Sequence, residues 1–176
     1  MLSNEPTCKF SPTEIAEELL QVYFQSGRDV TLRVQGWSMG YTLGPSREIA
    51  VRPLVHRPRL GDVVLLKTRN TFIAHRIILT MPGGRAYITK GDNCAAADAQ
   101  VSCNDILGLV IGINDGGIIR KPWHWTRPFS VFAALLSRLD NQRCPQAARL
   151  FSRIRYLSWR CGQLFRQSCA KNSTPQ

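Results

Sequence analysis

Three short segments of the chain hold residue types from which a hydrolytic site can be built. A serine hydroxyl can attack an amide when a neutral imidazole takes up its proton and later returns it to the leaving amine. A carboxylate on the far ring nitrogen fixes the tautomer of that imidazole. The segments that offer these groups in order are Gly36-Trp37-Ser38-Met39, Ala74-His75-Arg76-Ile77-Ile78, and Thr89-Lys90-Gly91-Asp92-Asn93 trailed by Asp98.

Each segment also has an ordinary structural interpretation. Ser38 can be a turn hydroxyl, and His75 can be a hydrogen-bonded core histidine on a half-buried strand. Asp92 and Asn93 can simply build a turn, because their side chains bond to nearby backbone groups. Taken singly, each segment favours the structural role. Taken together, they offer one candidate for each member of a catalytic triad.

The order and approximate separation of these segments resemble the signal-peptidase-like serine peptidases, the superfamily of signal peptidase I and the self-cleaving repressors. The resemblance is closest to the archaeal and endoplasmic-reticulum branch, which uses a Ser-His-Asp triad. That branch carries a Gly-x-Ser-Met box, a His-Arg-Ile/Val box in a later strand, and a Lys-Gly-Asp-Asn box followed by a second aspartate. The similarity spans about residues 34–113.

The resemblance implies a role for each matching residue. Ser38 becomes the nucleophile, His75 the general base and Asp98 the carboxylate that orients it, with Asp92 as structural support or as a competing third member. The bacterial branch has a lysine base where this chain has His75. The backbone amide of Ser38 is the expected oxyanion donor. The remaining box residues are expected to support the site: Gly36, Met39, Arg76, Lys90, Gly91 and Asn93.

The chain departs from the family pattern in two places. The family usually has a proline shortly after Ser-Met and a Gly-Asp pair before the next strand, which residues 40–48 replace here. The substrate-facing loop is therefore expected to differ. The membrane helix that normally anchors such enzymes also has no counterpart, which favours cleavage of a leader from a soluble or membrane-surface precursor over ordinary signal-peptide removal.

The elements that must position these residues are mostly strands. A capping sequence at Ser11 predicts a helix from about Pro12 to Gln25, with Ile15, Leu19, Val22 and Tyr23 along its apolar face and Leu20 and Phe24 widening it. Apolar alternation and turn signals then predict strands near Val30–Gln35, Glu48–Arg52, Asp62–Thr68, Phe72–Leu79, Arg85–Lys90 and Ile106–Ile113. Strands at close spacing without intervening helices predict a mainly β, antiparallel domain of the signal-peptidase-like kind.

Positive charge is concentrated in the last third of the chain. Residues 1–119 carry 12 basic and 11 acidic side chains, whereas residues 120–176 carry 11 basic side chains and Asp140 alone. We divide the chain accordingly into a helix plus β domain, 1–119, and a basic C-terminal extension, 120–176. Amphipathic helices are expected in that extension at Phe129–Leu139 and about Gln146–Gln167, the second with an apolar stripe that begins at Leu150.

Two roles for the basic extension stay open. It lies on an anionic membrane surface, with arginines at the headgroups, or it folds against the core or a partner protein with its basic face in solvent. Nucleic-acid binding ranks third, because no recognised motif accompanies the charge. Trp123 and Trp125 are expected to pack the extension onto the β domain.

Composition and cysteine spacing exclude several other classes of protein. Hydrophobic residues make up 44% and charged residues 20% of the chain, as in ordinary globular proteins. The six cysteines and three histidines show no zinc-ligand spacing, so we expect no metal and no cofactor, with the thiols free. Neither a secretory signal nor an apolar run long enough to cross a membrane is evident. We expect a cytoplasmic location, with the extension able to hold the protein at the inner face of the membrane.

The function predicted from the sequence is therefore a serine endopeptidase that removes a leader or signal-like segment from a peptide or protein precursor. The alternative is a catalytically inactive β module that binds an extended peptide by strand addition. A regulatory relative of the self-cleaving repressors is third, because the chain lacks both an N-terminal DNA-reading domain and the lysine base.

Overall fold

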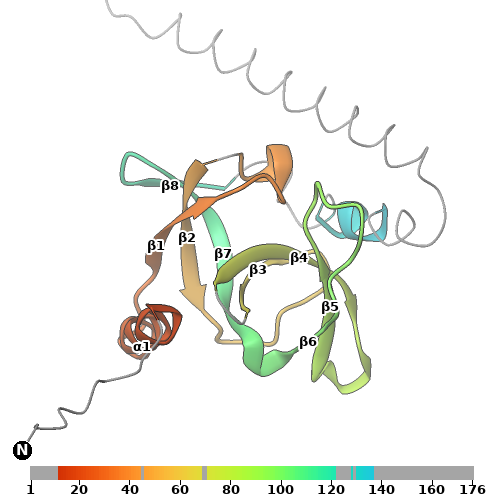
Figure 1. Cartoon of the computed structure of the whole chain (residues 1–176), viewed down its shortest axis with the longest axis horizontal. Coiled ribbons are helices and arrows are strands. Elements are labelled where there is room, and N and C mark those ends of the chain that lie inside the picture. The colour runs from red at the N-terminus through yellow and green to blue at the C-terminus, as the bar shows by residue number, and fades with distance from the viewer. Residues whose placement is uncertain (1–11, 45, 69–70, 122–127, 129, 137–176) are drawn as a thin grey trace, which may run out of the picture.

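Strands of three to ten residues form one curled antiparallel sheet (Figure 1). The computed structural model describes residues 12–44, 46–68, 71–121, 128 and 130–136. The sheet has eight strands, with the bounds β1 Val30–Gln35, β2 Ser46–Pro53, β3 Val63–Lys67, β4 Phe72–Thr80, β5 Ala86–Lys90, β6 Gln100–Ser102, β7 Ile106–Asp115 and β8 Ile118–Arg120. The prediction of a mainly β, antiparallel domain with an N-terminal helix is confirmed.

The strand order brings the three chemical segments together. Along the sheet the order is β1-β2-β7-β3-β4-β5-β6, and β8 pairs with β7. His75 lies on β4, and the loop after β5 carries Asp92 and Asp98. Because β4 and β5 are antiparallel neighbours, with Arg76 opposite Lys90, the loop after β5 begins next to His75. Ser38 follows β1, at the far end of the strand order, so the sheet must curl for the two to meet.

All six predicted strands are present, and two short strands were not predicted. β6 and β8 have three residues each, too few for an apolar alternation to be recognised. Gly116 and Gly117 both have positive φ, which lets them form the tight turn between β7 and β8. The strand β8 therefore ends one residue beyond the boundary predicted at residue 119.

The centre of the sheet is buried on both faces. Along β3, Val63 and Leu65 belong to one apolar cluster, while Val64 and Leu66 belong to a second on the opposite face. Side chains in a strand alternate between faces, so a strand that contributes to both clusters is covered on both sides. Because β3 is covered on both sides, it is fixed in the core, and its neighbour β4 is fixed beside it.

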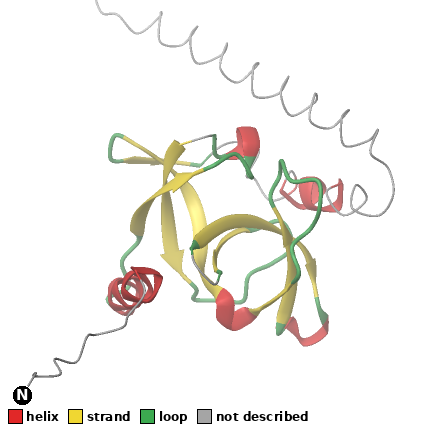
Figure 2. Cartoon of the chain, in the orientation of Figure 1, coloured by secondary structure: helices red, strands yellow, loops and turns green. Residues whose placement is uncertain are grey.

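Helix α1, Pro12–Gln25, packs with only part of the apolar stripe predicted for it. Leu20 is buried and Phe24 packs against the core, reaching the backbone near Gly108. The other residues of the predicted stripe are about half exposed: Ile15, Leu19, Val22 and Tyr23. The helix lies at the periphery of the sheet, beside β1 and β2 (Figure 2). Only the narrow stripe that points at these strands can be covered.

A short helical segment over residues 130–136 packs against the β domain. Ala134 is fully buried, and the backbone of Ser130 approaches Gly61 so closely that a Cβ there would lie 2.7 Å from it. This segment lies within the predicted helix Phe129–Leu139. The predicted helix at about 146–167, and the tryptophans at 123 and 125, lie outside the described residues. Within the described part of the chain, no helix is long and apolar enough to cross a membrane.

Candidate active site

His75 and Asp98 form a direct pair. The Nδ1 atom of His75 lies 2.6 Å from Oδ2 of Asp98. His75 is buried, with 6% of its surface exposed, whereas the Asp98 side chain is 27% exposed. The imidazole is thus held in the protein interior, and the carboxylate lies between it and solvent.

This contact determines which ring nitrogen of His75 is available. An ionised carboxylate can only accept hydrogen bonds, so Nδ1 must be the nitrogen that donates to Asp98. In neutral imidazole the other nitrogen then carries a free lone pair. Nε2 is therefore the atom that can accept a proton, which is the arrangement a general base requires.

The environment of Asp98 keeps it ionised. Partial burial would raise the pKa of Asp98, but the hydrogen bonds from His75 and Thr89 outweigh burial and hold the pKa below its ordinary value. Thr89 is fully buried on β5, and its hydroxyl donates to the same Oδ2 atom at 2.6 Å. Two donors thus converge on one carboxylate oxygen, and the charge remains at neutral pH.

Ser38 lies beside the free nitrogen of His75, with Gly91 between them. A methyl group built on Gly91 would lie 2.6 Å from the carbonyl oxygen of Ser38 and 3.0 Å from Nε2 of His75. The amide of Asn93 donates to the same Ser38 carbonyl at 2.7 Å. The loop after β5 therefore fixes the turn that carries Ser38, and only glycine leaves room for serine and histidine at this point.

The hydroxyl and amide of Ser38 have no partner among the described residues. No hydrogen bond there joins the Ser38 hydroxyl to His75, and none uses the Ser38 amide as donor. Catalytic hydrogen bonds are often long in unliganded sites and tighten when substrate binds. Ser38 as a residue is half-buried.

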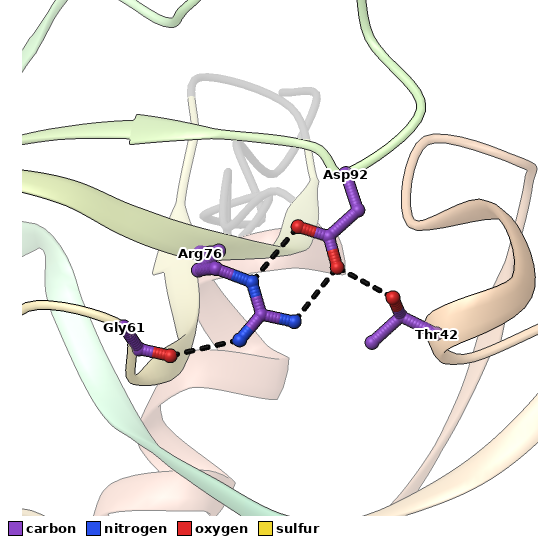
Figure 3. Close-up of polar contacts among 4 residues, drawn as sticks. All are labelled: Thr42, Gly61, Arg76 and Asp92. Carbon is purple, nitrogen blue, oxygen red and sulfur yellow. Dashed lines mark hydrogen bonds and ion pairs between the residues drawn. The ribbon is translucent and has the colours of Figure 1, made fainter. Parts of the chain in front are cut away.

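Asp92 belongs to a different structure, a buried ion pair with Arg76 (Figure 3). The guanidinium donates to both carboxylate oxygens, from Nε at 2.9 Å and from Nη2 at 2.7 Å. Its third nitrogen, Nη1, donates to the carbonyl of Gly61 at 2.8 Å, and the Thr42 hydroxyl donates to Asp92. The structure thus places Asp98, and not Asp92, against His75.

Burial and the partner of Arg76 act on its pKa in opposite directions. Burial of the guanidinium would lower its pKa, but the charge and hydrogen bonds of Asp92 outweigh this, and the pKa of Arg76 is raised. Arg76 therefore keeps its positive charge, and it directly follows His75 in the sequence. Because His75 and Arg76 are neighbours on a strand, they point to opposite faces, and each finds its own carboxylate.

The other predicted supporting residues occupy distinct places. Met39 is buried in the apolar core, where it anchors the turn after Ser38. Lys90 is almost fully buried on β5, and Asn93 is exposed. Gly36 has a φ of 102° and is exposed, at the point where β1 ends and the chain turns toward Ser38. No group of three or more His, Cys, Asp or Glu side chains among the described residues could hold a metal ion.

Three residues near the site were not predicted: Thr42, Thr89 and Cys94. The thiol of Cys94 lies 3.9 Å from the Ser38 carbonyl. Burial and the nearby Asp98 carboxylate raise the pKa of Cys94, which disfavours the thiolate that a cysteine nucleophile requires. Position was the available signal for Thr42 and Thr89, since Thr89 opens the third segment and Thr42 lies three residues after Met39.

The chain was compared with known proteins in three ways. No protein-family model matches it, and neither a curated protein nor a solved structure does. The assignment of function therefore depends on the residues and on their geometry.

Proposed function

We propose that this chain is a serine endopeptidase with the triad Ser38, His75 and Asp98. The observation that carries the proposal is the hydrogen bond between His75 Nδ1 and Asp98, which leaves Nε2 directed to the same point beside Gly91 as the Ser38 backbone. A core histidine without a catalytic role needs neither an ionised carboxylate nor an adjacent unbonded serine. We also propose that the peptidase is of the signal-peptidase-like type.

In the proposed mechanism, Ser38 Oγ attacks the scissile carbonyl while its proton passes to Nε2 of His75. Asp98 stabilises the imidazolium that forms. The Ser38 amide donates to the developing oxyanion. The C–N bond then breaks as His75 returns the proton to the leaving amine, which gives an acyl-enzyme on Ser38. Water, deprotonated by His75, then attacks the acyl carbonyl, the ester bond to Ser38 Oγ breaks, and His75 returns the proton to Oγ, which releases the acid and restores the serine.

We further propose that the substrate is a peptide or protein precursor that loses a leader segment. The turn at Trp37, which is 44% exposed, offers apolar surface next to Ser38 for such a segment. The basic residues of 120–176 would bring the protein to an anionic membrane surface or to a partner protein, with a cytoplasmic location at the inner face of the membrane. These residues are the main source of the net charge of +11.

The competing proposal, a catalytically inactive peptide-binding module, differs from the first in the reactivity of Ser38. A fluorophosphonate probe forms a covalent bond only with an activated serine, so wild-type protein is expected to be labelled and Ser38→Ala is not. Ser26→Ala is the matched control, because Ser26 is an exposed serine outside the site. Wild-type protein that resists the probe and leaves a peptide library intact would favour the binding module. Labelling that persists in Ser38→Ala would refute Ser38 as the nucleophile.

Gly91→Ala is expected to lower the labelling rate at least about tenfold. The added methyl group would lie 2.6 Å from both the Ser38 carbonyl and the Cys94 sulfur, closer than carbon atoms are found to such groups. Relief of this contact must displace the serine turn or His75, and small displacements in a catalytic site have large kinetic effects. Overpacking is expected to cost about 1–3 kcal/mol of stability as well.

The matched control for Gly91→Ala is Gly112→Ala on β7. A methyl group there would lie 2.8 Å from the Ile119 side chain and 2.9 Å from the backbone of Arg120. Neither of these residues belongs to the proposed triad. Gly112→Ala should therefore reduce stability while the folded protein is labelled at the wild-type rate. Equal labelling of the two variants would show that space at Gly91 is not needed for the reaction.

A further inference from the structure

Asp98 is joined to Thr89 by two hydrogen bonds that run in opposite directions. The Thr89 hydroxyl donates to Oδ2 of Asp98 at 2.6 Å, and the Asp98 amide donates to the Thr89 carbonyl at 2.8 Å. Thr89 is fully buried on β5, in the middle of the sheet order β4-β5-β6. The loop over residues 91–97 thus leaves the sheet and returns to the same residue pair, closed by both main-chain and side-chain contacts.

The geometry explains how a loop residue is aimed at a strand residue. A carboxylate in a loop can rotate freely unless other groups restrict it, and each wrong orientation would leave His75 without its partner. The Thr89 hydroxyl contacts Oδ2, the same oxygen that accepts from His75 Nδ1. The titratable groups that face Asp98 are His75 from β4 and the thiol of Cys94 from the loop. Thr89 is thus a hydrogen-bond donor to Asp98 that carries no charge.

We infer that Thr89 is a positioning residue of the proposed triad, which holds the Asp98 carboxylate in place against His75 through its hydroxyl. The inference rests on the proposed function for its catalytic meaning, but the contact itself can be tested without any reaction. Loss of the hydroxyl removes a donor to the carboxylate and makes a proton bind to it more readily. Loss of a hydrogen bond to a charged group corresponds to a change of about tenfold to a hundredfold in the equilibrium constant for proton binding to Asp98.

The first experiment titrates Asp98 in the full-length protein by NMR with ¹³C-labelled aspartate, in Thr89→Ser and Thr89→Ala. Both variants lose the Thr89 methyl group, and only Thr89→Ser keeps a hydroxyl, so their difference reports the hydrogen bond alone. The pKa of Asp98 is expected to rise in Thr89→Ala and to stay close to the wild-type value in Thr89→Ser. Thr89→Val, which keeps the shape of threonine, should behave as Thr89→Ala does.

The second experiment measures peptide hydrolysis against pH in the same variants. Thr89→Ala and Thr89→Val are expected to lose about tenfold to a hundredfold in kcat/KM, with the acidic limb displaced to higher pH, and Thr89→Ser should retain most of the activity. A merely structural role would lower stability without moving the pH profile. An unchanged Asp98 pKa in Thr89→Ala would overturn the inference. Inactive wild-type protein with a shifted Asp98 pKa in Thr89→Ala would instead refute the proposed function and leave the contact established.

Discussion

Ser38→Ala and His75→Ala are each expected to reduce kcat by a factor of about 10⁴ to 10⁶, and the double variant should be no worse than either alone. The nucleophile cannot be activated without the base, and the base has nothing to activate without the nucleophile. Ser38 is half-buried, and its hydroxyl makes no hydrogen bond within the described residues. Ser38→Ala should therefore leave the fold intact.

The measurement is steady-state hydrolysis of a peptide that the wild-type protein cleaves, with far-UV circular dichroism to verify folding. Asp98→Asn belongs to the same series and is expected to lose up to about 10⁴-fold, because an amide can hold the wrong tautomer of His75. Asp92→Asn should cost less activity in the folded fraction, since Asp92 contacts Arg76 and not His75. Wild-type turnover in Ser38→Ala or His75→Ala, or the opposite ranking of the two aspartates, would refute the assignment.

The strands that carry the site could be predicted because their signals are local. Apolar alternation over Phe72–Leu79 and Arg85–Lys90, with a Pro-Gly-Gly turn between them, predicts a hairpin, and β4 and β5 pair in that way. The hairpin alone brings the loop after β5 toward His75. The choice between Asp92 and Asp98 could not be made in this way. Both follow the same strand, and only the path of the loop determines which of them meets the histidine.

The closeness of Ser38 and His75 depends on features that sequence patterns do not record. Ser38 follows β1 and His75 lies on β4, strands that are separated in the sheet order, and the curl of the sheet brings the two residues to Gly91. The part of the apolar stripe of α1 that packs could not be singled out for a similar reason. Periodicity identifies an apolar stripe on a helix, but the neighbouring strands determine which part of it is covered. Here that part is Leu20 and Phe24.

The buried ion pair explains why Asp92 is unsuited to the triad. Its carboxylate accepts from Nε and Nη2 of Arg76 and from the Thr42 hydroxyl, so both of its oxygens are already engaged by other groups. Thr42 lies in the short helix η1, Gly40–Thr42, directly after the turn that carries Ser38. The pair thus joins the nucleophile turn to the loop after β5 and, through Gly61, to the turn before β3. Its integrity is a condition for the geometry of the site.

Asp92→Ala is therefore expected to lower the free energy of unfolding by about 3–5 kcal/mol, the range for a buried ion pair that loses one partner. Arg76 is 2% exposed and would remain as an unpaired cation in the interior. The double variant Asp92→Leu with Arg76→Met should recover much of this loss, because removal of both charges leaves no buried charge to solvate. Urea denaturation at neutral pH measures all three proteins.

The chain offers a matched control in the pair between Arg52 and Asp29. It is also bidentate, with both nitrogen–oxygen distances at 2.9 Å, but the Arg52 side chain is 54% exposed. Asp29→Ala is expected to cost no more than about 1 kcal/mol, since water solvates the arginine that remains. The two pairs have similar hydrogen bonds and differ mainly in burial. Equal losses in Asp92→Ala and Asp29→Ala would therefore contradict the prediction that desolvation of Arg76 makes Asp92 indispensable to the fold.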